Sequence, residues 1–216
     1  MIQCIDVVKR YGDKTVLNRI SVSFEKGLIH GIVGRNGSGK TMLLKAICGF
    51  IPLSGGEIRV WGKAVKSGRT PEGVGLIIEA PGFLPYYSGY RNLQILAGIN
   101  GGVSGQRIRQ VMELVGLDPG SRKWVSKYSM GMRQRLGIAQ AVMEDPELLL
   151  LDEPMNGLDN QGVEDMRRLF LDFKAQGKTI LLASHSREDI QALCDRVYKM
   201  DAGTLSPQDT PVPETV

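Results

Sequence analysis

Residues 34–41 read Gly34-Arg35-Asn36-Gly37-Ser38-Gly39-Lys40-Thr41. This glycine-rich segment follows a short apolar run at Leu28–Val33, which has the length of a buried strand. It opens a run at Lys40–Cys48 that we expect to be helical. The segment matches G-x-x-x-x-G-K-[S/T] at every fixed position, in the strand–loop–helix context that the pattern requires. An incidental glycine-rich turn is therefore the weaker interpretation.

A loop of this kind binds phosphate groups for physical reasons. Glycines let the backbone wrap around the phosphates, so that successive N–H groups point inward at the positive end of a helix dipole. Lys40 is expected to reach the β- and γ-phosphates, and the Thr41 hydroxyl to bind Mg²⁺. Alone, the loop indicates only a bound nucleoside triphosphate, since GTPases, nucleoside kinases and helicases share it. The expected nucleotide contacts come from Gly34, Asn36, Gly37, Ser38, Gly39, Lys40 and Thr41.

Two carboxylates follow another apolar strand at Leu148–Leu151. In open parallel sheets the active site lies at the carboxyl ends of the strands, which places Asp152 and Glu153 beside the phosphate loop. We expect Asp152 to hold Mg²⁺ and Glu153 to orient or deprotonate an attacking water. A solvated acidic turn is the alternative, and the order of the two motifs along the chain makes it improbable.

His185 follows the predicted strand Thr179–Ala183 directly, again at a carboxyl end. From there its side chain can hydrogen-bond a γ-phosphate. A single histidine is more often structural than functional, so this prediction depends on the position of His185 relative to the other motifs. The predicted catalytic residues are Lys40, Glu153 and His185.

The remaining sequence alternates predicted strands and helices, which is typical of an α/β fold with a mostly parallel sheet covered on both faces. An antiparallel start is expected, with strands at Ile2–Val8 and Thr15–Phe24 joined by a turn at 11–13. Residues from about 88 to 145 form a predicted helical insertion in one domain of 216 residues. The tail after Leu205 is expected to be frayed. The other predicted strands are Glu57–Trp61, Val74–Ile78 and Arg196–Met200, and the other predicted helices are Arg91–Gly98, Gln106–Val115, Gly131–Met143, Val163–Ala175 and Arg187–Leu193.

Composition limits the classes of partner. A net charge of +4 is too small to argue for nucleic-acid binding, and no basic run supports it, so no nucleic-acid partner is expected. No apolar stretch approaches the eighteen or so residues that cross a bilayer. Work at a membrane would therefore require a separate spanning subunit. Three widely spaced cysteines predict reduced, buried thiols.

One further segment identifies a family. Residues 128–135 read Tyr128-Ser129-Met130-Gly131-Met132-Arg133-Gln134-Arg135 and precede the strand that carries the carboxylates. This resembles the signature of ABC ATPases, usually Leu-Ser-Gly-Gly-Gln. Ser129 and Gly131 match, whereas Tyr128, Met130 and Met132 depart. A hydroxyl and a glycine N–H at the N-terminus of a helix form a second anion site.

The resemblance extends from about Ile2 to Leu205 and implies a P-loop NTPase core of the ABC ATPase type, with an antiparallel β subdomain and an inserted α-helical subdomain. It implies that Tyr11 stacks on adenine with Val16 packing nearby. The segment 156–159 resembles the D-loop, which ends at Asp159. The family also implies a head-to-tail dimer, in which one subunit's phosphate loop and the other's Ser129–Gly131 enclose ATP. The partner ATPase would be an identical copy or a paralogue.

Glu79 departs from the family pattern. Most ABC ATPases have glutamine after this strand, whereas the segment here is Ile78-Glu79-Ala80-Pro81-Gly82-Phe83. Such a loop resembles those of the bacitracin and lantibiotic immunity exporters. A carboxylate ~5 Å from a phosphate charge would cost on the order of 3 kcal/mol at an effective dielectric of ~20, unless Mg²⁺ offsets it. We therefore expect Glu79 to join Thr41 and Asp152 as a metal contact. The alternative is that Glu79 faces solvent and only shapes the loop.

Three functions are weighed. The first is the energising subunit of a membrane exporter of peptide antibiotics, peripheral on the cytoplasmic face of the membrane. Its separate permease would dock near Ala80–Tyr90 and the helical insertion. Phe83, Tyr86, Tyr87 and Tyr90 form an aromatic cluster there, although local packing explains these aromatics nearly as well. The second is a soluble ABC ATPase acting on ribosomes or DNA. The third is a non-catalytic nucleotide sensor, against which the intact catalytic set argues.

Overall fold

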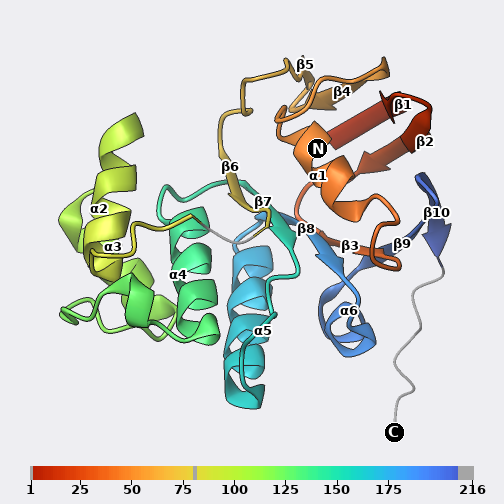
Figure 1. Ribbon diagram of the computed structural model, residues 1–216. Helices are drawn as coiled ribbons and strands as arrows, with labels where there is room; N and C mark the ends of the chain where they lie inside the picture. Colours follow the sequence, from red (N-terminus) through yellow and green to blue (C-terminus); the bar gives the residue numbers. More distant parts are fainter. Residues whose placement is uncertain (1, 80–81, 209–216) are drawn as a thin grey trace, which may run out of the picture.

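The computed structural model describes residues 2–79 and 82–208, with two β-sheets and helices on both sides of the larger one (Figure 1). The larger sheet has six strands in the order β10-β9-β3-β8-β7-β6, and the smaller has four in the order β2-β1-β4-β5. The strands are β1 Ile2–Tyr11, β2 Lys14–Phe24, β3 Ile29–Val33, β4 Gly55–Val60, β5 Lys63–Ala64, β6 Val74–Ile77, β7 Leu148–Asp152, β8 Thr179–Ser184, β9 Arg196–Asp201 and β10 Thr204–Gln208. The helices are α1 Lys40–Ile47, α2 Gly89–Asn100, α3 Gly105–Leu114, α4 Met130–Val142, α5 Asn160–Ala175 and α6 Arg187–Leu193, with a 3₁₀ turn at Val125–Lys127.

The larger sheet is parallel from β9 to β6, and only β10 runs antiparallel to its neighbour. Strand β7 shows why the strands of this sheet lack an alternation of polar and apolar residues. Successive side chains point to opposite faces, and Leu149 and Leu151 belong to one apolar core while Leu148 and Leu150 belong to the other. All four leucines are buried, so both faces of the sheet are covered.

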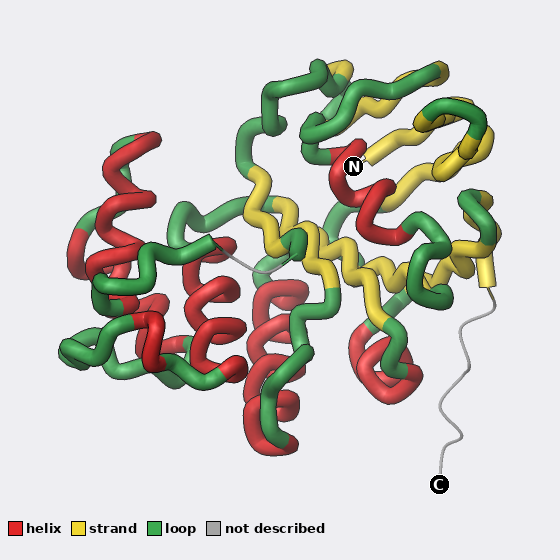
Figure 2. Tube along the Cα trace, viewed as in Figure 1, coloured by secondary structure: helices red, strands yellow, loops and turns green. Residues whose placement is uncertain are grey.

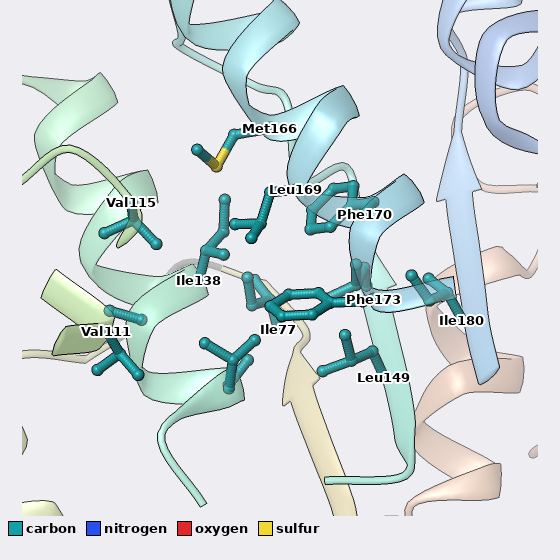
Figure 3. Close-up of a cluster of buried hydrophobic side chains, with 14 of the residues drawn as sticks. Ile77, Val111, Val115, Ile138, Leu149, Met166, Leu169, Phe170, Phe173 and Ile180 are labelled. Carbon is teal, nitrogen blue, oxygen red and sulfur yellow. The ribbon is translucent and has the colours of Figure 1, made fainter. Parts of the chain in front are cut away.

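The core on the helical face is formed by α5, α4 and α3 against strands β6 to β8 (Figure 3). Phe170 and Phe173 of α5 lie beside Leu149 and Ile180 of the sheet, and Ile138 of α4 faces Leu169. The apolar residues of α5 recur at helical spacing, which presents one face to the sheet. The core on the opposite face packs α1 between the two sheets.

Helices α2, α3 and α4 lie together, on the side of the molecule away from the smaller sheet (Figures 1 and 2). Serine side chains cap all three: Ser88, Ser104 and Ser129 each accept a hydrogen bond from a backbone N–H in the first turn. Such caps satisfy donors that a helix N-terminus leaves unpaired. No helix within residues 2–79 and 82–208 has the length and apolar character to cross a membrane.

The expected fold class is confirmed, with one correction at the C-terminus. The tail after Leu205 was expected to fray, but residues 204–208 form strand β10, which pairs with β9 from Asp201 back to Val197. Pro207 lies in this strand, and a proline is tolerated there because β10 is at the edge of the sheet. The final residues, 209–216, lie outside the described part of the chain, as do Ala80 and Pro81 of the predicted docking segment.

Candidate active site

The predicted phosphate loop, carboxylates and histidine converge at one edge of the larger sheet. Strands β3, β8, β7 and β6 are neighbours and parallel, so their carboxyl ends meet (Figure 1). The phosphate loop follows β3, Asp152 ends β7, and His185 follows β8. This arrangement has the form expected for ligand sites of open α/β sheets.

The phosphate loop is shaped by its glycines and by Lys40. Gly39 has φ +118° and Gly37 has φ +78°, a region of backbone conformation that favours glycine. At Gly34 a side chain would overlap the Met200 carbonyl oxygen. The Lys40 ammonium donates hydrogen bonds to the carbonyl oxygens of Gly34 at 2.7 Å and Arg35 at 3.4 Å. The buried lysine therefore lies curled against its own loop.

A cavity of about 520 Å³ opens over the loop. Ser38 lines it, and its buried Oγ has no hydrogen-bond partner among the described residues. An unpartnered buried hydroxyl is costly unless a ligand satisfies it, so the loop fits an anionic ligand with acceptor oxygens. The cavity is lined by Lys14, Thr15, Val16, Arg35, Asn36, Gly37, Ser38, Gly39, Lys40, Thr41, Met42, Asp152, Glu153, Ala202 and Gly203.

Thr41 and Asp152 meet across the site, where Thr41 Oγ1 donates a 2.6 Å hydrogen bond to Asp152 Oδ2. Burial raises the pKa of Asp152, and the bond from Thr41 partly opposes this. A hydroxyl and a carboxylate are oxygen ligands that suit Mg²⁺. Within the described residues no group of three or more histidine, cysteine or acidic side chains is placed to hold a metal by itself. These donors therefore fit a magnesium ion that completes its shell with nucleotide phosphates and water.

Glu153 and His185 form a second pair. His185 Nδ1 lies 2.8 Å from Glu153 Oε2, and the His185 backbone N–H donates to the same oxygen at 3.4 Å. Glu153 has φ +49°, a conformation that is uncommon outside glycine. Its backbone N–H donates to the Ala183 carbonyl oxygen at 2.8 Å, which holds it at the end of the sheet. Glu153 lines both the loop cavity and an adjoining cavity of about 550 Å³ that contains His185.

Glu79 lies at the same edge but is paired with a lysine. Its Oε1 accepts a 2.6 Å hydrogen bond from Lys45 Nζ, and its side chain is 64% exposed. Lys45 lies one turn after Thr41 on α1, and Glu79 has φ +63°. The carboxylate therefore has a cationic partner that no local sequence pattern indicated.

The structure places only one of the two predicted adenine contacts in the loop cavity. Val16 lines the loop cavity, whereas Tyr11 does not. Tyr11 is half exposed, and the Lys9 ammonium lies 4.4 Å from the centroid of its ring. One side of the aromatic ring is thus in contact with a cation.

The signature residues lie on a separate surface. Ser129, Gly131 and Asp159 line a cavity of about 770 Å³ that shares no residue with the loop cavity. Ser129 caps α4 through the Met132 N–H, and Asp159 caps α5 through the Gly162 N–H. Gly131 approaches the Gly157 carbonyl so closely that a Cβ would lie 2.9 Å from its oxygen. The phosphate-loop residues and the signature residues therefore line two separate cavities.

Sequence reasoning missed several residues of the site. Lys14, Thr15, Ala202 and Gly203 line the loop cavity. They come from the β1–β2 hairpin and the β9–β10 turn, and no motif marks them. Only the tertiary fold brings these turns beside the loop.

A phosphate loop, paired carboxylates and a histidine at the carboxyl edge of such a sheet define a P-loop nucleoside triphosphatase. The family model described as "ABC transporter" matches residues 17–156. The chain belongs to this family, as its signature segment predicted, and is an ATPase subunit of ABC transporters.

Named relatives extend along most of the chain. It is 45% identical to the uncharacterized ABC transporter ATP-binding protein YybJ of Bacillus subtilis (strain 168), over 95% of this chain and 94% of that protein. It is 42% identical to the bacitracin transport ATP-binding protein BcrA of Enterococcus faecalis, over 95% of this chain and 68% of that protein. The lantibiotic transport ATP-binding protein SrtF of Streptococcus pyogenes is 35% identical, over 90% of this chain and 84% of that protein. The predicted resemblance to bacitracin and lantibiotic transporters is confirmed.

Solved structures agree on the fold. The dimeric post-hydrolysis state of the ATP-binding cassette MJ0796, bound to ADP and Pi, matches with a TM-score of 0.87. The match covers 98% of this chain and all of that one at 19% identity. At this identity the match supports the ABC cassette fold alone.

Proposed function

We propose that this protein is the Mg²⁺-dependent, ATP-hydrolysing subunit of an exporter of peptide antibiotics, acting with a separate transmembrane permease at the cytoplasmic face of the membrane. The observation that carries the chemistry is the assembly of Lys40, Thr41, Asp152, Glu153 and His185 at one sheet edge. The bacitracin and lantibiotic relatives, together with Glu79, support the cargo class.

The roles follow from the contacts. Lys40 would exchange its bonds to the Gly34 and Arg35 carbonyls for phosphate oxygens. Glu153 would orient or deprotonate the attacking water, and its contact with His185 leaves the other imidazole nitrogen for the γ-phosphate. Thr41 and Asp152 would hold Mg²⁺, joined by Glu79 on its release from Lys45. A bound Mg²⁺ neutralises the charge that builds up on the phosphates.

A second ATPase subunit completes the site in this proposal. Ser129 and Gly131 lie on a surface of their own, apart from the loop cavity. In a head-to-tail dimer the signature surface of one subunit covers the loop cavity of the other. The second subunit would be another copy of this chain or a paralogous ATPase.

The permease is proposed to dock beside α2, where aromatic side chains are exposed. Tyr86 is 70% exposed and packs edge-on against Trp124, with ring centroids 5.7 Å apart. Tyr87 and Leu84 are also exposed nearby. Phe83 and Tyr90 instead pack partly against the helical core, so local packing accounts for that half of the predicted surface.

Hydrolysis is tested with Glu153→Gln. This substitution keeps the shape of the side chain and removes the base, so kcat should fall by roughly a hundredfold or more while ATP still binds. Phosphate release with and without Mg²⁺, and fluorescent-nucleotide binding, measure the two effects. The non-catalytic alternative would be supported if the wild-type chain released no phosphate.

The transport role is tested by recovering the partner. The Glu153→Gln variant, loaded with ATP and purified from detergent-solubilised membranes, should carry a polytopic permease. Cells expressing both subunits should show lower susceptibility to bacitracin or a lantibiotic than cells expressing the Lys40→Ala subunit. Association with ribosomes or DNA and no permease would instead favour the soluble alternative.

A further inference from the structure

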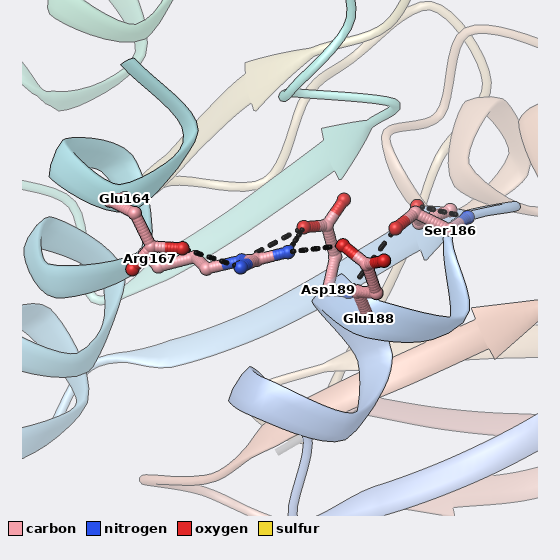
Figure 4. A network of polar contacts seen from close by, with 6 residues as sticks. Glu164, Arg167, Ser186, Glu188 and Asp189 are labelled. Carbon is pink, nitrogen blue, oxygen red and sulfur yellow. Dashed lines mark hydrogen bonds and ion pairs between the residues drawn. The ribbon is translucent and has the colours of Figure 1, made fainter. Parts of the chain in front are cut away.

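A network of charged groups ties α5 to α6 (Figure 4). At its centre, Arg167 of α5 donates two hydrogen bonds to Asp189 Oδ1, from Nε at 3.0 Å and from Nη2 at 2.6 Å. Its Nη1 donates to Glu164 Oε1 at 2.6 Å, and Nη2 lies 3.7 Å from Glu188 Oε2. Figure 4 shows the guanidinium reaching from α5 between these carboxylates.

The pair at the centre is largely removed from water. The Asp189 side chain is 5% exposed and the Arg167 side chain 15%. Removing one partner from a buried ion pair leaves an uncompensated charge, which is far more disruptive than losing a surface pair. The position of Asp189 is therefore strongly tied to that of Arg167.

Asp189 lies in the first turn of α6, a helix of only seven residues. Ser186 caps this helix by accepting a hydrogen bond from the Asp189 N–H at 3.2 Å. The Ser186 N–H donates to Ser184 Oγ, at the end of β8, at 3.0 Å. His185 is the single residue between these two serines, so the start of α6 sets where His185 lies.

His185 has little packing of its own to hold it, because its side chain is 62% exposed. What fixes it are the flanking turn and its contacts with Glu153. Arg167, Asp189, His185 and Glu153 all line the same cavity of about 550 Å³. The arginine thus lines the same cavity as the catalytic pair, and its hydrogen bonds and ion pairs go to Glu164, Glu188 and Asp189 instead.

We propose that Arg167 is a positioning residue for catalysis: by holding Asp189 it fixes the N-terminus of α6, and with it His185 against Glu153. The same helix α5 begins directly after Asp159, on the signature surface. Arg167 therefore also links two contact regions. Its own helix, α5, would meet the second subunit, and His185, which Arg167 positions, would meet the γ-phosphate. This inference rests on the proposed ATP hydrolysis.

The test compares Arg167→Met and Arg167→Lys with Arg168→Met, a matched substitution at the exposed neighbouring arginine. Arg167→Met should lower kcat between about 10- and 100-fold, since small misplacements of catalytic groups have effects of this size. ATP binding should stay within about twofold of wild type, because Arg167 is not among the residues lining the loop cavity. The kcat of Arg167→Lys should lie between those of the wild type and Arg167→Met, because lysine keeps the charge but cannot donate the same two hydrogen bonds. Arg168→Met should behave as wild type.

If Arg167 only stabilised the fold, the variants would show a different pattern of kcat and Tm. In a His185→Ala background, Arg167→Met should cause little further loss of kcat if it acts through His185, whereas independent effects would multiply. A lowered Tm with unchanged kcat, or multiplying losses, would overturn the positioning role. Should Arg167→Met fail to fold, Arg167→Lys and Asp189→Asn carry the same comparison. Absence of hydrolysis by the wild type would overturn the proposed function itself, which is a separate result.

Discussion

Glu79 combines an unusual residue choice with a specific partner. Where most ABC ATPases have glutamine, this chain places a carboxylate 2.6 Å from Lys45 Nζ. The lysine offsets a charge that would otherwise repel bound phosphates. Glu79 can therefore be tolerated beside the phosphate loop in the absence of a metal, and would approach Mg²⁺ only by leaving Lys45.

Replacing Glu79 with glutamine should make nucleotide binding less dependent on Mg²⁺. The neutral side chain removes the repulsion that Mg²⁺ offsets, so the ratio of ATP affinities with and without Mg²⁺ should fall several-fold, on the order of 1 kcal/mol after screening by solvent and Lys45. Titration of fluorescent ATP with and without Mg²⁺ measures this. Glu113→Gln, at an exposed position on α3, is the control. Unchanged Mg²⁺ dependence would show that Glu79 only shapes its loop.

His30 is a buried histidine away from the catalytic groups. Its Nε2 donates to the Glu25 carbonyl oxygen at 2.9 Å, because a carbonyl can only accept, and its Nδ1 has no partner among the described residues. Burial lowers the pKa of His30, although the bond to Glu25 partly opposes this. The folded protein therefore favours neutral His30.

Stability should consequently depend on pH through His30. Its contribution is fully present above the unfolded-state pKa of about 6.5 and is lost as the pH falls below that value, because the unfolded chain then binds the proton more readily. Urea unfolding of wild type and His30→Gln between about pH 8 and about pH 5.5 isolates this contribution. The wild type should lose more stability than the variant. Equal slopes for wild type and His30→Gln would contradict this account.

At the scale of elements, strand β6 and helix α4 pack through a glycine. Gly75 is buried in β6, and a Cβ there would overlap the Ala141 carbonyl oxygen of α4. Only the missing side chain lets the strand and helix approach so closely. Gly98, at an exposed position of α2, has no atom within 4 Å of its Cβ position.

Alanine should therefore have opposite effects at these two glycines. Gly75→Ala should destabilise the fold by about 1–3 kcal/mol through overpacking. Gly98→Ala should stabilise it by about 0.5–1 kcal/mol, since alanine favours the helix and nothing obstructs its methyl group. Chemical denaturation of both variants measures the difference. A neutral Gly75→Ala would mean that the β6–α4 spacing is not fixed.

The elements that could be predicted are those with strong local signals. The buried strand β7, the helical face of α5 and the strand–loop–helix at Gly34–Thr41 all follow from runs and spacings of apolar and glycine residues. Helix α6 was predicted with its observed bounds, whereas α5 begins at Asn160 rather than Val163 because Asp159 caps it. Strand β10 was missed because Pro207 argues against a strand unless its edge position is known.

The side-chain pairs of the site could not be predicted. Glu79 and Lys45 are 34 residues apart, and Arg167 and Asp189 are 22 apart. Neither spacing corresponds to a local period, so only the packed elements bring these partners together. Sequence could place Asp152, Glu153 and His185 at one sheet edge, but not the 2.8 Å contact between His185 and Glu153.

At the scale of the whole molecule, we propose that one chain carries halves of two different sites. The loop cavity contains Lys40, and the signature cavity contains Ser129, with no residue in common. If ATP is enclosed in a head-to-tail dimer, a phosphate-loop defect can be placed in one chain and a signature defect in the other. A mixed dimer would then contain one site with both defects and one site with neither.

Mixing Lys40→Ala with Ser129→Arg distinguishes a site shared between two subunits from a site contained in one. Each variant alone should hydrolyse no ATP, because every site in its own dimer has a defect. Mixed in equal amounts, they should regain hydrolysis at up to about a quarter of the wild-type site number, since half of the dimers are mixed and each has one intact site. Hydrolysis by Ser129→Arg alone, or a mixture as inactive as its components, would contradict a site shared between two subunits.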